Sequence, residues 1–326
     1  MESNVSQTQL LLNCTIAVLI PCYNEGLTIA GVIADMRAAL PHARVYVYDN
    51  NSTDDTISRS RAAGAIVRTE RNQGKGNVVR RMFADIDADV YLLLDGDGTY
   101  DTGAAPELVR LILEGGLDFV NGKRQESSDQ AYRTGHKFGN RLFTGLVQKI
   151  FGYGFDDMLS GYKCFSRRFV KSFPAMSRGF EIETEVIIHA LELRMPCCEL
   201  MTRYDKRPPG SASKLRTYRD GWRILMMILR LVKEERPLQM FSLIGAGLMV
   251  MAVVLALPLL FTYLQTGLVP RFPTAILATG LGLAGGASLC IAIVLDNVLT
   301  TRRELKRIAY LSIPLVNANR DIPDQS

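Results

Sequence analysis

Along residues 14–121, short apolar runs alternate with longer stretches in which apolar residues recur every three or four positions. The short runs predict strands at 15–20, 43–49, 65–69, 89–95 and 117–121. The longer stretches predict helices at 27–40, 54–63, 76–86 and 104–115. Nearly continuous apolar strands separated by helices are typical of a parallel sheet covered on both faces, so this part of the chain predicts an α/β fold.

The next part of the chain is less regular. Residues 122–175 are rich in glycine, with a helix predicted at 135–151. A helix at 181–193 and a strand at 197–204 complete the predicted globular part. Residues 220–232 are apolar with regularly spaced arginines, which predicts a helix lying at a membrane interface, although a buried helix fits the pattern nearly as well.

Two segments near the C-terminus, 237–270 and 272–295, contain no charged residue. Roughly 20 apolar residues in a helix cross a bilayer, so both segments predict membrane spans. Basic residues precede the first span and follow the second, which predicts that both ends face the cytoplasm. The expected organisation is a flexible tail (1–13), a cytoplasmic domain (14–216), an amphipathic interface helix (217–236), two transmembrane helices (237–296) and a cytoplasmic tail (297–326).

Charge and cysteine content narrow the class of protein further. The net charge is +5, and ten basic residues against four acidic ones lie between Arg203 and Arg236, directly before the first span. This placement favours anionic lipid head groups over nucleic acid as the partner, a solvated helix face being the alternative. The six cysteines form no CxxC pair and have no histidine at metal-binding spacing, which argues against structural zinc or a disulfide framework and fits a reducing compartment.

Polar residues follow the first four predicted strands, at 21–25, 49–54, 71–77 and 95–101. The carboxyl ends of parallel strands meet at one edge of a sheet, where ligands bind. The segments bring carboxylates, amides, glycines and a lysine to that edge. This combination predicts a pocket for a nucleotide with phosphates and a divalent cation.

Three of these motifs suggest individual roles. Asp49 is suited to accept hydrogen bonds from a base or ribose, or it caps a turn. Gly74, Lys75 and Gly76 open a helix, where amide groups and an ammonium group would meet a phosphate, although such a sequence is often an ordinary turn. Asp95 and Asp97 flank a glycine after a buried strand, which favours a hard cation such as Mg²⁺ over a solvent-exposed turn.

Segments 21–25, 49–54, 72–76 and 95–97 together resemble the family 2 glycosyltransferases of the GT-A fold, whose domain has a Rossmann-like, mostly parallel sheet with helices on both faces. Within that family the chain is similar to the polyprenyl-phosphate glycosyltransferases, the dolichyl-phosphate mannose synthase group and its bacterial relatives. The resemblance covers about residues 14–216, and two C-terminal spans are a known arrangement among the bacterial relatives.

The resemblance implies a role for each matching residue. Asp49 would contact the nucleotide base, Asp95 the ribose and metal, and Asp97 the metal on the diphosphate. The remaining nucleotide-binding positions would be Pro21, Tyr23, Asn24, Glu25, Asn51, Gly74, Lys75 and Gly96. Arg124 would approach a phosphate, Arg133 would receive the lipid phosphate, and Arg207 and Lys214 would belong to a mobile basic loop over the diphosphate. The stretch from Asp157 to Tyr162 would lie near the donor sugar, followed by Glu181 and Glu183.

The chain departs from the family pattern at a few positions. Asn50 replaces a common aspartate, Asn51 a common glycine, and His136 a small residue. Thr99 stands where a glutamine often completes the metal shell, and we expect it to be a metal ligand here. These departures leave the identity of the nucleotide open.

The implied reaction is the inverting transfer of a hexose from a UDP- or GDP-sugar to undecaprenyl or dolichyl phosphate, with Mg²⁺ or Mn²⁺. The product would serve cell-envelope or glycan assembly, and the resemblance favours the cytoplasmic face of a bacterial plasma membrane. Small residues in the second span (Gly280, Gly282, Gly285 and Gly286) permit a homo-oligomer. No nucleic-acid partner is expected.

Three alternatives remain. A processive polysaccharide synthase uses a similar domain, but Trp222, the single tryptophan, lacks the sequence context of its Gln-x-x-Arg-Trp motif. A transferase acting on a neutral lipid would need a general base, for which Asp157, Glu181 or Glu183 could serve. A non-catalytic nucleotide-sugar-binding membrane anchor would not need both Asp95 and Asp97.

Overall fold

The computed structural model describes residues 14–126, 154–179, 181–205 and 236–315, together with Gly145, Val147 and Lys233. The chain divides into two compact units. One comprises Met1–Thr217 and Lys306–Ser326, and the other comprises Tyr218–Leu305.

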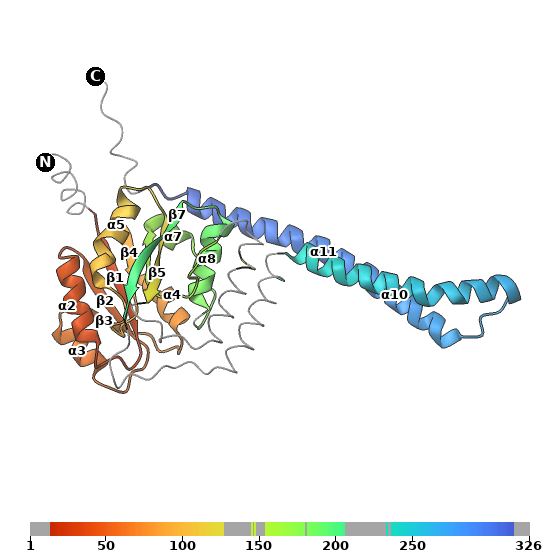
Figure 1. The fold of residues 1–326 in the computed structure, drawn as a ribbon, viewed down its shortest axis with the longest axis horizontal. Coiled ribbons are helices and arrows are strands. Elements are labelled where there is room, and N and C mark those ends of the chain that lie inside the picture. Colours follow the sequence, from red (N-terminus) through yellow and green to blue (C-terminus); the bar gives the residue numbers. More distant parts are fainter. Residues whose placement is uncertain are drawn as a thin grey trace, which may run out of the picture. The chain divides into compact units, whose positions relative to one another are not determined.

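The first unit is built on a seven-stranded sheet with the order β3-β2-β1-β4-β6-β5-β7 (Figure 1). Its strands are β1 (Ile16–Cys22), β2 (Arg44–Asp49), β3 (Ile66–Thr69), β4 (Val90–Leu93), β5 (Phe119–Glu126), β6 (Lys163–Ser166) and β7 (Cys197–Tyr204). Strand β6 pairs antiparallel with β4 and β5, and every other pairing is parallel. The predicted mostly parallel sheet is therefore confirmed.

Helices cover both faces of the sheet because successive strand residues point to opposite sides and both sides are apolar. The helices and the short 3₁₀ turn of this unit are α2 (Ile29–Ala39), α3 (Thr56–Ala62), α4 (Lys75–Asp85), η1 (Thr102–Ala104), α5 (Ala105–Leu113), α7 (Arg167–Ser172) and α8 (Ile182–Glu192). Neighbouring residues of β1 such as Val18 and Leu19 are both fully buried. One core joins β1 and β4 to α2 and α5.

The pattern of apolar residues located most of these elements within a few residues. The predicted strand at 197–204 coincides with β7, and the helix at 181–193 with α8. The pattern missed β6 and α7, since a four-residue strand next to a six-residue helix shows neither period clearly. The helices expected at 135–151 and 220–232 fall outside the described residues, apart from Gly145 and Val147.

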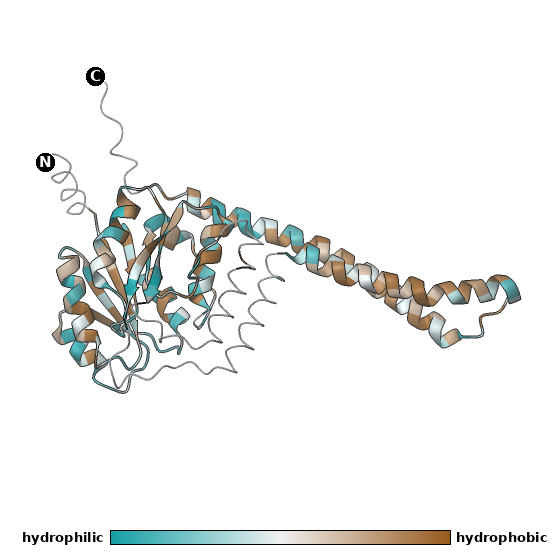
Figure 2. Ribbon diagram, in the orientation of Figure 1, coloured by the Kyte–Doolittle hydropathy of each residue, from teal (hydrophilic) through white to brown (hydrophobic). Residues whose placement is uncertain are grey.

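The second unit contains α10 (Pro237–Thr266) and most of α11 (Phe272–Leu311), both long and apolar enough to cross a membrane. Apolar residues run along both helices (Figure 2). The two helices approach closely at Gly245 and Gly285, where a Cβ atom on Gly285 would lie 3.0 Å from the Gly245 carbonyl oxygen. Helix α11 continues to Leu311, past residue 297 where a tail was expected, because the polar sequence there still consists of good helix formers.

An aromatic cluster fills the space between the sheet and α4, α7 and α8. Phe165 stacks on Phe119 and Phe169, with ring centroids 5.4 and 4.9 Å apart. His189 packs edge-on against Phe169, and its Nε2 lies 3.2 Å from the Ser172 hydroxyl. Burial, helped by the charge of Lys306, lowers the pKa of His189 to about 3.

This burial of neutral His189 makes stability depend on pH. Above pH 6.5, the pKa of this residue in the unfolded chain, His189 is neutral in both states and its contribution to the stability of the fold is fully present. As the pH falls from 6.5 toward 3, the unfolded chain binds a proton that the folded chain does not, so the free energy of unfolding decreases. Between pH 7.5 and 5.0 we expect a loss of about 2 kcal/mol from this residue. Denaturant unfolding at the two pH values should show a smaller loss for His189→Gln than for the unchanged protein. Equal losses would contradict the assignment.

Candidate active site

The loops that follow β1 and β2 are joined by hydrogen bonds. The side-chain oxygen of Asn24 accepts from the Thr53 amide at 2.8 Å, and the Asn24 amide donates to the Ser52 hydroxyl at 2.9 Å. Asn24 has a φ of 54°, a left-handed conformation that asparagine tolerates better than most residues. The Glu25 amide donates to the Thr56 hydroxyl at 2.9 Å. Asn24 and Glu25 thus shape the loops, while Pro21 and Tyr23 lie beside them, partly exposed.

Asp49 lies at the end of β2 with 1% of its surface exposed. Its Oδ2 accepts from the Ser52 amide at 3.0 Å, whereas its Oδ1 is buried and has no hydrogen-bond partner within the described part of the chain. A buried carboxylate oxygen without a donor is costly. Asp49 therefore presents an acceptor that a ligand N–H or O–H group would satisfy.

The two asparagines that depart from the family pattern tie this loop to residues 70–74. The buried Asn50 amide donates to the carbonyls of Glu70 and Asn72, both at 2.9 Å. The Asn50 side-chain oxygen accepts from the Gly74 amide at 2.7 Å. Asn51, with a φ of 66°, donates to the Arg71 carbonyl at 2.9 Å. An aspartate carries no N–H donor and could not make the two donations of Asn50.

Asp97 follows β4 and is 2% exposed. Its Oδ1 accepts from the Thr99 hydroxyl at 2.6 Å and from the Thr99 amide at 3.2 Å. Thr99 therefore holds the carboxylate in one orientation. Gly96 is closely packed, since a Cβ atom there would lie 2.8 Å from the Cys22 sulfur.

Lys75 forms the central ion pair of the site. Its ammonium group lies 2.5 Å from Asp95 Oδ1 and 2.6 Å from Glu183 Oε1. Burial alone would lower the pKa of Lys75, but the charges of Asp95 and Glu183 outweigh burial and raise this pKa above its ordinary value. Lys75 thus stays protonated and links the start of α4 to the loop after β4 and to α8.

The role of Gly74 and Lys75 in binding a phosphate stays a prediction, and two amide groups at the start of α4 have partners within the protein. The Gly76 amide donates to the Gly179 carbonyl at 3.1 Å, and the Asn77 amide to those of Gly74 and Arg178. A Cβ atom on Gly74, whose φ is 129°, would lie 2.2 Å from the Arg178 carbonyl oxygen. The backbone of residues 177–179 therefore covers part of this helix end, where the Gly76 and Asn77 amides donate to protein carbonyls.

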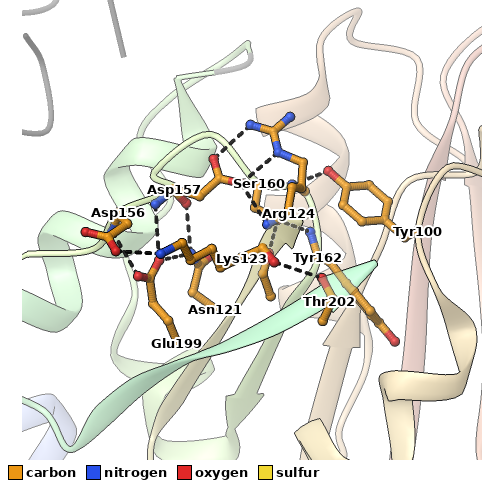
Figure 3. A network of polar contacts seen from close by, with 12 residues as sticks. Tyr100, Asn121, Lys123, Arg124, Asp156, Asp157, Ser160, Tyr162, Glu199 and Thr202 are labelled. Atoms are coloured by element: carbon orange, nitrogen blue, oxygen red, sulfur yellow. Dashed lines mark hydrogen bonds and ion pairs between the residues drawn. The ribbon is translucent and has the colours of Figure 1, made fainter. Parts of the chain in front are cut away.

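Arg124, on β5, forms a two-pronged ion pair with Asp157 (Figure 3). Its Nε lies 2.7 Å from Asp157 Oδ2 and its Nη2 lies 2.8 Å from Oδ1. Burial tends to raise the pKa of Asp157, but hydrogen bonding to Arg124 and the arginine charge lower it overall. The guanidinium also lies 5.4 Å from the centre of the Tyr204 ring, a cation–π distance.

The loop that carries Asp157 is fixed from below by Glu199 of β7 (Figure 3). Glu199 accepts from the Asp156 amide at 2.9 Å and from the Asn121 side chain at 2.9 Å. Asn121 in turn accepts from the ammonium of Lys163, a fully buried residue, at 2.7 Å. Burial lowers the pKa of Lys163 to about 8.

The same loop ends beside Asp95. The Gly161 amide donates to the Tyr100 hydroxyl at 2.7 Å, and a Cβ atom on Gly161 would lie 2.4 Å from Asp95 Oδ2. Only a glycine allows this approach. The structure thus joins Asp95, Lys75, Glu183, Gly161 and, through its loop, Asp157 in one site.

No functional role was predicted from the sequence for Asn121, Lys163 or Glu199. Asn121 ends the strand predicted at 117–121, so the strand-end rule that found Asp49 and Asp95 applied to it as well. Lys163 and Glu199 lie within strands and gave no comparable signal. Arg133, Arg207 and Lys214 fall outside the described residues.

Comparison with known proteins assigns this site to a family. Residues 17–173 match the model described as glycosyl transferase family 2. The glycosyltransferase AglJ of Haloferax volcanii is 33% identical over 299 residues, which are 91% of this chain and 98% of AglJ. The chain belongs to glycosyltransferase family 2. The sequence resemblance, the fold class and the assignment as an enzyme are confirmed.

Two further comparisons bear on the site. The undecaprenyl-phosphate 4-deoxy-4-formamido-L-arabinose transferase of Pseudomonas aeruginosa is 27% identical over 77% of this chain and 75% of its own length. The crystal structure of glucosyl-3-phosphoglycerate synthase from Mycobacterium tuberculosis with Mn²⁺, UDP-glucose and glycerol 3-phosphate superposes with a TM-score of 0.51 at 25% identity. This superposition covers 63% of this chain and 76% of the synthase.

Asn50→Asp should destabilise the first unit by about 2 kcal/mol, because it removes two donations and places a carboxylate against two carbonyls. Asn51→Asp is the matched control, since Asn51 is exposed and its replacement should cost well under 1 kcal/mol. Denaturant midpoints of the two variants measure the difference. Equal midpoints would show that the Asn50 contacts do not support the loop.

Proposed function

We propose that this family 2 glycosyltransferase moves a hexose from a nucleotide sugar to a polyprenyl phosphate at a membrane surface. The observation that carries the proposal is the presence, in one chain, of a GT-A site and two long helices whose apolar side chains face outward. A water-soluble sugar donor and a lipid-borne acceptor require this combination. The name of the Pseudomonas aeruginosa relative, which specifies undecaprenyl phosphate, supports the same acceptor class.

The donor half of the proposed site is the edge formed by β1, β2 and β4. The Asp49 Oδ1, which has no partner among the described residues, suits an N–H group of the base or a ribose hydroxyl. UDP is the nucleotide we favour, because the Mycobacterium tuberculosis synthase binds UDP-glucose. Asn50 and Asn51 would act indirectly, by holding the loop beside the base.

A divalent cation fits the carboxylates after β4. No three His, Cys, Asp or Glu side chains converge on a metal position within the ranges that the structure describes. Asp97, oriented by Thr99, is a hard oxygen ligand of the kind that Mg²⁺ and Mn²⁺ take in small number, with phosphate and water as the other ligands. When bound, the ion would neutralise charge that develops on the leaving diphosphate. Asp95 would lie nearer the ribose, held by Lys75.

The acceptor half requires little proton chemistry. A lipid phosphate has a second pKa of about 6 and is mostly dianionic at neutral pH, so it is already a nucleophile. Its oxygen would form a bond to the anomeric carbon while the bond from that carbon to the nucleoside diphosphate breaks. This single displacement inverts the anomeric configuration, giving a β-linked polyprenyl-phosphate sugar from an α-linked donor and releasing the nucleoside diphosphate.

Among the residues that the structure describes, we assign Arg124 to the acceptor phosphate. A guanidinium has five N–H groups, of which one on Nε and one on Nη2 donate to Asp157, and these two bonds fix the plane of the group. We assign Arg133 to the lipid phosphate and Arg207 and Lys214 to the diphosphate from the family pattern. These positions would counter the repulsion between two phosphates.

The ion pairs disfavour a neutral lipid hydroxyl as acceptor. Such a hydroxyl would need a general base, and two of the three candidates, Asp157 and Glu183, are paired with cations. The pKa of Asp157 is lowered, which makes it a weaker base. The lipid-phosphate reaction needs no such base.

The membrane assignment rests on exposed apolar side chains. Leu243, Phe261 and Leu283 are 77%, 63% and 72% exposed, a pattern that lipid would cover and water would not favour. With the basic flanks on both sides, the catalytic domain would face the cytoplasm, and by resemblance the membrane would be a bacterial plasma membrane.

Asp97→Asn should reduce transfer at least 100-fold, because it removes the charged metal ligand. The assay offers purified protein undecaprenyl phosphate, Mg²⁺ or Mn²⁺ and radiolabelled UDP-, GDP- or dTDP-sugars, and measures label entering the organic phase. Asp101→Asn is the control in the same loop, since Asp101 caps the following 3₁₀ turn. Transfer to diacylglycerol but not to the lipid phosphate would overturn the proposed acceptor, and full activity of Asp97→Asn would overturn the proposed metal role.

A further inference from the structure

The last turns of α11 belong to the first unit and contact two of its buried carboxylates. Lys306 and Tyr310 are four positions apart and therefore lie on one face of the helix. The Tyr310 hydroxyl donates to Asp118 Oδ2 at 2.6 Å, and the Lys306 ammonium lies 2.5 Å from Glu192 Oε2. The side chains of Asp118 and Glu192 are 0% and 1% exposed.

Asp118 is the more heavily bonded of these carboxylates. It also accepts from the Ser166 hydroxyl at 2.6 Å and from Arg168, whose Nη2 lies 2.7 Å from Oδ2 and whose Nε contacts Oδ1. The Arg168 guanidinium lies 4.9 Å from the centre of the Tyr310 ring. Burial raises the pKa of Tyr310, with a further contribution from Asp118, so its hydroxyl keeps the proton that it donates.

These contacts hold the far ends of the elements that carry the active site. Asp118 directly precedes β5, whose later residues include Arg124. Ser166 ends β6, which begins two residues after Gly161. Glu192 ends α8, whose first turn carries Glu183. One end of each element therefore lies at the active site. The other end contacts α11 directly, or contacts Asp118, which Tyr310 of α11 binds.

We propose that Lys306 and Tyr310 form a strap that completes the catalytic unit. Asp118 and Glu192 are charges removed from water, and a buried charge that loses its partner is strongly destabilising. The strap supplies a cation to Glu192 and a donor to Asp118 from a segment more than 100 residues away in sequence. The catalytic unit consequently depends on the helix that emerges from the second apolar segment, whatever donor and acceptor the enzyme uses.

The test uses the full chain in detergent. Lys306→Met should lower the melting temperature by about 10 °C, because the buried Glu192 then loses its contact with the Lys306 ammonium. Arg307→Met is the matched control, since Arg307 is the exposed neighbour and its loss should leave the melting temperature unchanged. Adding Glu192→Gln to Lys306→Met should restore much of the loss, which a general defect of α11 would not allow.

The rate of cysteine modification distinguishes local loosening near the strap from a loss of stability throughout the catalytic unit. Cys164 is fully buried in β6, and Cys22 is buried at the end of β1. Tyr310→Phe removes one hydroxyl and should fold, and it should speed modification of Cys164 by N-ethylmaleimide several-fold more than that of Cys22, measured by mass spectrometry. Equal melting temperatures of Lys306→Met and Arg307→Met, or equal acceleration at the two cysteines, would overturn the proposal.

Discussion

The pairing of buried carboxylates with cations is the constraint on which this enzyme's structure depends. A carboxylate removed from water must find a cation or several donors, or it will take up a proton. Lys75 meets this requirement for Glu183 and also binds the partly exposed Asp95, and Arg124 meets it for Asp157. Each pair joins segments far apart in sequence, so the loops around the site cannot move independently without exposing a charge.

The same pairs define the chemistry that the site can perform. Carboxylates that neutralise Lys75 and Arg124 are poor general bases, and the buried His189 lies among aromatic rings rather than at the site. These carboxylates are therefore poorly suited to a reaction that requires proton removal from a weakly acidic hydroxyl. Attack by a phosphate that is already ionised needs alignment and charge stabilisation, which a set of oriented cations and carboxylates provides.

The fold and the edge at which the site lies were predictable from sequence, whereas several contacts within the site were not. Asp49, Asp95 and Asp97 follow apolar strands, and the geometry of a parallel sheet brings such residues together. The pairing of Lys75 with Asp95 and Glu183 was not predictable, because these carboxylates lie 20 and 108 positions away in sequence and meet the ammonium only after the chain has folded. Glu199 and Lys163 were missed because a polar residue within a strand resembles an ordinary surface position until its burial is known.

The sequence by itself determined the class of the protein: an α/β domain with its polar strand ends at one edge, followed by two apolar segments long enough to cross a bilayer. Local periodicity and the residues next to each strand suffice for that, since both are properties of neighbouring positions. The tertiary structure alone decided that β6 enters the sheet antiparallel, that Lys75 binds carboxylates, and that Tyr310 of α11 reaches Asp118. These features depend on which distant groups are buried together, because only burial makes an unpaired charge costly enough to select its partner.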